Sequence, residues 1–255
     1  LRDYQAAAIE RLRESMRQGH RRPILQAPTG YGKTLVASDV VRMARAKDKR
    51  VVFCVPALAL IDQTLEAFCE HGLHDIGVIQ AKHVSTDGRR PIQIASVQTL
   101  ARREFPETDL VIIDECHRLY ETYTKWMAEQ PRLPFIGLSA TPWTRGLGQH
   151  FDDLIISATT KELIDAGHLS RFRVFAPAHP DLSRVSVVAG DYHEGQLSEA
   201  MSDSALVADV VETWMKHGEN RPTLVFGVDR AHAKKLQNQF IEAGIRNVYQ
   251  PCIRF

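Results

Sequence analysis

The sequence predicts an α/β protein built on a doubly wound parallel sheet, and two observations carry this prediction. Short apolar runs recur along the chain, and stretches with helical periodicity separate them. The runs are apolar throughout rather than alternating, which is typical of parallel strands covered by helices on both faces. The expected strands are residues 24–26, 51–55, 76–79, 92–95, 110–113 and 135–138.

Helices are expected before, between and after these strands. Residues 4–18 place Ile9, Leu12 and Met16 on one helical face, and residues 35–46 follow the first strand. A helix at 160–167 ends on Gly167, a typical C-terminal signal. We expect a first domain over residues 1–169 and a second over 170–255. The second is expected to hold strands at 172–175 and 223–227 and helices at 206–217 and 231–243.

Composition narrows the class of protein. The chain has 255 residues, 44% of them hydrophobic and 25% charged, and a formal net charge of +1, so any nucleic-acid binding needs a local basic patch. Its four cysteines include no CxxC pair, which argues against a zinc site or a disulfide framework. No apolar run approaches the roughly 20 residues that span a bilayer, and no signal peptide is visible. We expect a soluble intracellular protein, cytoplasmic or in the nucleoid or nucleus, with no membrane partner and a trimmed N-terminus.

A phosphate-binding loop is predicted at residues 27–34, APTGYGKT, between the first expected strand and the helix that follows. Backbone N–H groups of such a loop and of the helix N-terminus can surround phosphate oxygens. Lys33 supplies a point charge for the outer phosphates, and the hydroxyl of Thr34 can hold Mg²⁺. Ala27 stands where the usual pattern has its first glycine. The candidate loop residues are Pro28, Thr29, Gly30, Tyr31, Gly32, Lys33 and Thr34.

Two carboxylates close the apolar strand in residues 110–117, LVIIDECH. An acidic residue at a strand end beside a phosphate loop is where Mg²⁺ needs a second protein contact, which is the role expected of Asp114. Glu115 is then the candidate that polarises the attacking water. The alternative is that both carboxylates only favour the N-terminus of a following helix. The phosphate loop about 80 residues upstream, within one domain's length, favours the chemical interpretation.

Further motifs are ordinary taken singly. Ser139-Ala140-Thr141-Pro142 after a strand is usually a turn, and Tyr4-Gln5 is usually surface. In this order, however, the segments LRDYQ (1–5), APTGYGKT, DECH (114–117) and SATP (139–142) resemble the superfamily-two helicases and translocases. The resemblance is to the DEAD/DEAH-like group of excision-repair helicases, phage recombination helicases and restriction-enzyme motors. It implies a RecA-like P-loop domain over 1–169, followed by an incomplete second RecA-like domain.

The resemblance also implies ATP and Mg²⁺ as cofactors and assigns further residues. Gln5 would read the adenine edge, with Tyr4 or Arg2 packing nearby. Lys33, Asp114, Glu115 and His117 would be catalytic, and Ser139 and Thr141 would couple the nucleotide state to the nucleic-acid face. Pro56, Gln63, Ser96, Gln98 and Thr99 fall in segments that look like the family's first nucleic-acid-contacting motifs. DNA is favoured over RNA only because of the group resembled, and Lys82, His83, Arg89, Arg90, Arg102 and Arg103 could add basic contacts.

The sequence departs from the family at its end. The motif QxxGRxxR, which supplies arginines to the γ-phosphate, is absent, and Gln250 with Arg254 is only a partial echo. We therefore expect a truncated second domain and a chain that is a weak motor by itself. Three alternatives stay open: an ATP-gated nucleic-acid binding module with little catalysis, the motor part of a restriction or repair complex, and a P-loop kinase. A kinase would have no use for Gln5, SATP or residues 56–63.

Overall fold

Seven parallel strands form the sheet of the first unit, in the order β3-β4-β2-β5-β6-β1-β7. The computed structural model describes residues 1–80, 83–175, 180–188, 191–202 and 204–250, and it falls into two units, of which the first is Leu1–Arg171 and the second begins at Phe172. The strands are β1 Pro23–Gln26, β2 Val51–Val55, β3 Ile76–Ile79, β4 Ile92–Ser96, β5 Leu110–Asp114, β6 Phe135–Ser139 and β7 Asp153–Ile156. The predicted doubly wound parallel sheet is confirmed.

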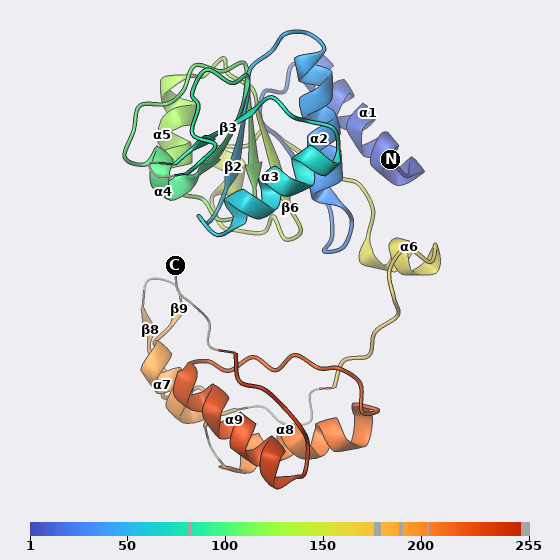
Figure 1. The fold of residues 1–255 in the computed structure, drawn as a ribbon, viewed down its shortest axis with the longest axis vertical. Coiled ribbons are helices and arrows are strands. Elements are labelled where there is room, and N and C mark those ends of the chain that lie inside the picture. Colours follow the sequence, from blue (N-terminus) through green and yellow to red (C-terminus); the bar gives the residue numbers. More distant parts are fainter. Residues whose placement is uncertain (81–82, 176–179, 189–190, 203, 251–255) are drawn as a thin grey trace. The chain divides into compact units, whose positions relative to one another are not determined.

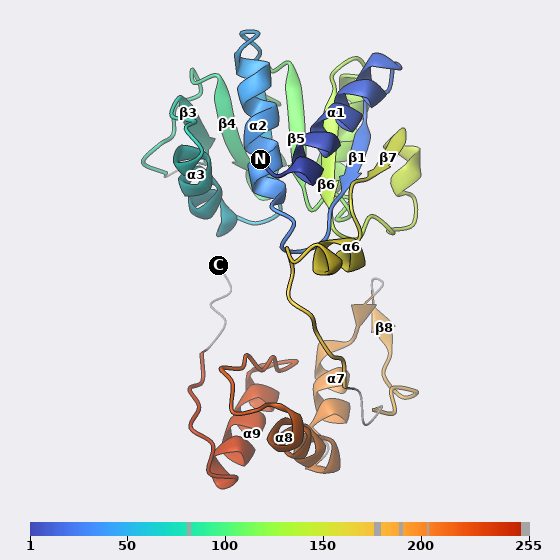
Figure 2. The same cartoon turned by 90° about the vertical axis from the view of Figure 1, so that its right-hand side faces the viewer.

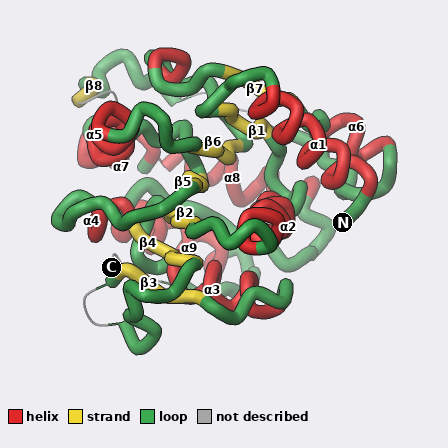
Figure 3. The backbone as a smooth tube through the Cα atoms, turned by 90° about the horizontal axis from the view of Figure 1, so that it is seen from above, coloured by secondary structure: helices red, strands yellow, loops and turns green. Residues whose placement is uncertain are grey.

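Helices cover both faces of this sheet, as Figures 1 and 2 show. In Figure 3 the strands form a row, with α1 and α2 on one side and α4 and α5 on the other. Alternate side chains of β2 serve the two cores: Val51 and Phe53 join the core under α1, α2 and α3, and Val52 joins the core under α4 and α5. The helices are α1 Asp3–Arg17, α2 Lys33–Arg45, α3 Leu60–Glu70, α4 Val97–Leu100, α5 Glu121–Glu129 and α6 Thr160–Asp165, with a 3₁₀ turn at Leu147–Gln149.

All six strands predicted for the first unit are present, but β7 was not predicted. Among the described residues it pairs with β1 alone, as an edge strand, and its Leu154 and Ile156 are exposed while Ile155 is buried. The strand contains a short apolar run, Leu154 to Ile156, which the sequence analysis did not include among the expected strands. No helix in the described residues is both long and apolar enough to cross a membrane.

The second unit is helical in its described parts, apart from a short hairpin. It contains strands β8 Val187–Val188 and β9 Asp191–Tyr192, which pair antiparallel, and helices α7 Glu194–Met201, α8 Ser204–His217 and α9 Arg230–Glu242. The predicted helices correspond to α8 and α9, but the predicted strands at 172–175 and 223–227 are wrong, because neither segment belongs to a sheet. A strand needs a paired neighbour, and the described residues of this unit offer none beside these segments. Leu224 and Phe226 are consequently each 86% exposed.

Candidate nucleotide-binding site

Three neighbouring strands bring the predicted motifs to one edge of the sheet. The phosphate loop follows β1, Ser139 ends β6 and Asp114 ends β5, and these strands lie in the order β5-β6-β1. Parallel neighbours lie about 4.8 Å apart, so side chains at three successive carboxyl ends can meet across roughly 10 Å. Ligands bind at this edge in doubly wound folds.

The phosphate loop depends on glycine at two positions. Gly30 has φ +79° and Gly32 has φ +89°, a left-handed backbone that L-residues adopt at a cost. A Cβ on Gly32 would lie 2.6 Å from Gln5 Nε2, and a Cβ on Gly30 would lie 2.8 Å from Leu169 Cδ2. By contrast Ala27, where the usual pattern has glycine, is fully buried and extends the pairing of β1, because its N–H donates to the carbonyl of Ser139 over 2.9 Å. The departure at Ala27 therefore leaves the loop itself intact.

The Tyr31 side chain is buried and joins the phosphate loop to α1 and to the segment after β7. Its side chain is 1% exposed, its hydroxyl donates to the carbonyl of Tyr4 over 3.0 Å, and it also hydrogen-bonds to Ser157. Burial raises the pKa of the Tyr31 hydroxyl. The Gln5 amide donates to the Tyr31 carbonyl over 2.9 Å and accepts from the Arg2 N–H over 2.9 Å. The side chain predicted to read adenine thus also supports the phosphate loop.

The sequence analysis did not predict that the residues after β7 and after α6 contact the phosphate loop. Ser157 follows the unpredicted strand β7, and Leu169 follows α6 and packs over Gly30. The His168 ring lies 5.1 Å from the ring of Tyr4 between centroids, and the Arg2 guanidinium donates to the Tyr4 hydroxyl over 3.1 Å. No local pattern marks these residues, because only the return of the chain beside β1 brings them to the loop.

Lys33 and Glu115 meet across the edge of the sheet. Lys33 Nζ lies 3.5 Å from Glu115 Oε1, and the other oxygen of Glu115 lies 3.3 Å from His117 Nδ1. Burial, followed by the charge of Glu115, raises the pKa of the neighbouring carboxyl group of Asp114. Glu115 has φ +49°, an uncommon backbone conformation for a residue other than glycine. Lys33 is therefore in contact with Glu115, and the N–H of Glu115 donates to the Asp114 carboxylate over 3.1 Å.

His117 connects this cluster to the end of β6. Its Nδ1 lies 2.9 Å from the hydroxyl of Ser139, and that hydroxyl accepts the N–H of Thr141 over 3.0 Å. Thr144 donates its hydroxyl to the His117 carbonyl over 2.7 Å, a contact that the sequence did not predict. A continuous path of contacts thus runs from Lys33 to the turn after β6: ion-pair contacts join Lys33 to Glu115 and Glu115 to His117, and hydrogen bonds join His117 to Ser139 and Ser139 to Thr141. The coupling role expected of His117, Ser139 and Thr141 stays a prediction.

Asp114 and Thr34 carry oxygen donors of the kind that Mg²⁺ takes when it binds together with a nucleotide. The described residues contain no cluster of three or more His, Cys, Asp or Glu side chains able to hold a metal. Mg²⁺ is usually held by one or two protein oxygens, with phosphates and waters completing its shell. Burial and the charge of Glu115 raise the pKa of Asp114, and a nearby cation would favour its ionised form. Thr34 is the second residue of α2, at the same edge of the sheet.

The segments predicted to contact nucleic acid also lie at this edge. Gln98 donates its amide to the carbonyl of Pro56 over 2.8 Å, so the two predicted segments touch. Ser96 is fully buried and caps α4 by accepting the N–H of Thr99 over 3.3 Å, which accounts for it structurally. Gln63 is exposed on α3. Gln63 and Gln98 are both exposed residues, and they stay candidates for nucleic-acid contact, Gln98 through the amide oxygen that its bond to Pro56 does not use.

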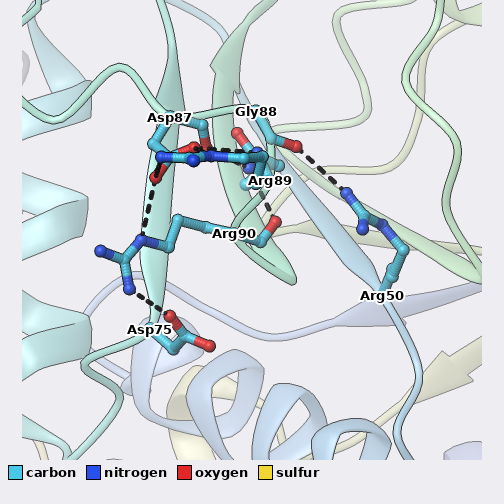
Figure 4. Close-up of polar contacts among 7 residues, drawn as sticks. Arg50, Asp75, Asp87, Gly88, Arg89 and Arg90 are labelled. Carbon is cyan, nitrogen blue, oxygen red and sulfur yellow. Dashed lines mark hydrogen bonds and ion pairs between the residues drawn. The ribbon is translucent and has the colours of Figure 1, made fainter.

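The basic residues predicted to contact nucleic acid lie in different places in the first unit. Arg89 and Arg90 precede β4 and therefore lie at the opposite, amino-terminal edge of the sheet, where Asp87 and Asp75 pair with them at 3.0 and 2.6 Å (Figure 4). Hydrogen bonds from Arg89 lower the pKa of Asp87 to about 2. Arg102 and Arg103 are exposed just after the end of α4. His83 hydrogen-bonds to Asp62, and Lys82 lies outside the described residues. Arg254 of the partial arginine motif also lies outside them.

A glycine-bearing loop, a lysine held by a strand-end carboxylate and a doubly wound parallel sheet together define a P-loop protein of the RecA-like type. Residues 1–144 match the family described as the res subunit of type III restriction enzymes, and the chain belongs to this family. The resemblance to superfamily-two helicases is thereby confirmed.

Individual relatives agree with this assignment. The chain is 28% identical over 284 aligned residues to IRC3 of Saccharomyces cerevisiae, which is named as an ATP-dependent helicase. This alignment covers 98% of this chain and 40% of IRC3. It is 34% identical over 152 residues to the DNA 3′-5′ translocase XPB2 of Sulfurisphaera tokodaii, covering 59% of this chain and 32% of XPB2. The UvsW helicase of bacteriophage T4 shares the fold, with a TM-score of 0.53 at 20% identity over 61% of this chain and 59% of UvsW. The chain spans less than half the length of the curated relatives it matches.

Proposed function

We propose that this chain is the nucleotide-hydrolysing portion of a DNA helicase or translocase, with ATP and Mg²⁺ as its cofactors. The observation that carries the proposal is the contact path from Lys33 through Glu115 and His117 to Ser139, which spans the ends of β1, β5 and β6. A kinase would need the lysine and the carboxylate but not the continuation to Ser139. DNA is proposed as the partner because a relative is named as a DNA translocase.

Each residue of the path has a role in the proposed hydrolysis. The exposed backbone of Gly30 and Gly32 and the N-terminus of α2 bind phosphate oxygens, and Lys33 neutralises the outer phosphates. Thr34 and Asp114 would hold Mg²⁺, which when bound would supply positive charge beside the outer phosphates. Glu115 orients the attacking water and accepts its proton. Because Lys33 lies against Glu115 here, phosphate must compete for the lysine, and its arrival frees the carboxylate oxygen that faces Lys33 to bind the attacking water, while the other oxygen stays near His117.

This chain alone is proposed to hydrolyse ATP slowly. The sequence contains no QxxGRxxR motif, and an arginine at the γ-phosphate contributes about 10³- to 10⁵-fold in rate, or about 4–7 kcal/mol of barrier. The alternative of an ATP-gated nucleic-acid binding module with little catalysis describes the same behaviour in this chain. A chain that hydrolyses ATP slowly, or that only binds nucleic acid when ATP is bound, could also be part of a restriction or repair complex.

The test compares nucleotide binding and hydrolysis in the chain and in Lys33→Ala. Lys47→Ala is the matched control, because Lys47 is an exposed lysine just past the end of α2 and makes no ion pair in the described structure. We expect a fluorescent ATP analogue to bind the chain and Lys47→Ala equally, and Lys33→Ala at least tenfold more weakly. Phosphate release with and without DNA then measures turnover. Equal binding by all three proteins would overturn the proposal.

A further inference from the structure

Trp143 is conspicuous because its indole is exposed on a turn that the fold holds rigidly. It is 65% exposed, and it is the one Phe, Tyr or Trp classed as exposed among the described residues of the first unit. Trp126, by comparison, is completely buried in the same unit. Large aromatic side chains are ordinarily buried for most of their area, so an exposed indole invites a partner.

The backbone on both sides of the indole is fixed. Pro142 before it is buried, and the Trp143 N–H donates to the Thr141 carbonyl over 2.8 Å. After it, the Thr144 hydroxyl donates to the His117 carbonyl over 2.7 Å, and Leu147, 3% exposed, anchors the end of the turn. The side chain is thus presented outward from a braced turn, so ordering that backbone on binding costs little.

The turn carries the chemistry of a single-strand contact. It follows β6 directly, so it lies at the same carboxyl edge of the sheet as the phosphate loop. Arg145, two residues after the indole, is exposed and makes no ion pair within the described part of the chain. Aromatic faces that stack on bases, with nearby cations for the backbone phosphates, are how proteins bind single strands without sequence preference.

We propose that Trp143 stacks on an unpaired base of a single-stranded nucleic acid and that Arg145 pairs with an adjacent phosphate. This inference rests on the proposed function, and it names the part of the substrate that the turn after β6 contacts. Because Thr144 bonds directly to the backbone of His117, strand binding on this turn reaches the residue that contacts Glu115. The same contact would therefore let a bound strand alter the catalytic carboxylate.

The experiment measures binding of fluorescein-labelled oligo(dT) of 20 nucleotides, and of a blunt duplex of equal length, by anisotropy with the whole chain. One stacked base contributes about 1–3 kcal/mol, so Trp143→Ala should weaken oligo(dT) binding about 5- to 150-fold. Trp143→Phe should recover part of this loss, and neither variant should change duplex binding. Arg145→Gln should weaken oligo(dT) binding and lower the magnitude of its salt slope by about 0.7.

Intrinsic fluorescence gives a second readout. Saturating oligo(dT) should quench the emission of the chain and of Trp214→Phe, but not that of Trp143→Phe. Binding of the ATP analogue by Trp143→Ala must match that of the unaltered chain, which shows that the variant is folded. Equal oligo(dT) binding by Trp143→Ala, or an equal loss on the duplex, overturns the stacking proposal. If the unaltered chain binds the ATP analogue but not oligo(dT), the stacking proposal is also overturned. If the unaltered chain does not bind the ATP analogue, the proposed function is refuted instead.

Discussion

Replacing Gly32 by alanine tests how closely the phosphate loop is packed against α1. Gly32 has φ +89°, and an added Cβ would lie 2.6 Å from Gln5 Nε2. Gly72, which follows the end of α3, has nearly the same backbone, φ +81°, but an added Cβ there meets nothing within 4 Å. Gly72→Ala is therefore a matched control that carries the backbone cost without the steric conflict.

The two variants should differ by the cost of moving one amide. The left-handed conformation costs an alanine about 1–2 kcal/mol at either site. At Gly32 the Gln5 side chain must also move, which breaks its buried 2.9 Å bond to the Tyr31 carbonyl. Losing a buried hydrogen bond costs about 1–3 kcal/mol, so we expect Gly32→Ala to lower the free energy of unfolding by about 2–5 kcal/mol and Gly72→Ala by about 1–2 kcal/mol.

Urea unfolding monitored by Trp126 measures both losses in the first unit, in a Trp143→Phe, Trp214→Phe background that leaves one indole. A double-mutant cycle with Gln5→Ala isolates the conflict, because the extra loss at Gly32 should then disappear. Equal losses at the two glycines, or an extra loss that persists without Gln5, would refute the reasoning.

Three further predictions follow from the site and from the second unit. Glu115→Gln should bind the ATP analogue at least as tightly as the unaltered chain, because Lys33 loses a competing carboxylate, and should slow phosphate release at least about 100-fold; undiminished release would contradict the role of Glu115. The folded-state pKa of Asp114 is raised, so the folded protein favours the protonated carboxyl group. Its contribution to the free energy of unfolding is therefore fully present below the ordinary pKa of Asp and is lost as pH rises through the raised value. Asp114→Asn should therefore be more stable than the unaltered chain at pH 7, with the gain vanishing at low pH in urea titrations. Because Leu224 and Phe226 are each 86% exposed, we expect the chain to self-associate in sedimentation velocity, and Leu224→Thr with Phe226→Thr to reduce this association without altering the unfolding of the first unit. A chain that sediments as a monomer, or equal association by the variant, would contradict this prediction.

How far the sequence could predict the site depends on whether each contact is local. The phosphate loop and the strand-end carboxylates are read from a few adjacent residues, because glycine, lysine and carboxylate each serve a specific need of phosphate and Mg²⁺. The support of the loop could not be read in this way. Ser157 and Leu169 reach it only because β7 pairs with β1 and the chain returns past Gly30.

By itself, the sequence determined the central parallel strands and the order of the chemical motifs, because continuously apolar runs must be buried on both faces wherever they pair. Only the tertiary structure decided which strands are neighbours, and the order β5-β6-β1 is what brings Glu115, Ser139 and Lys33 to one edge. The segment 223–227 is a case in which the sequence pattern predicted a strand and the tertiary structure contains none. Its apolar residues have strand propensity, but a strand forms through backbone pairing with a neighbour, and no such neighbour lies beside it in the described residues.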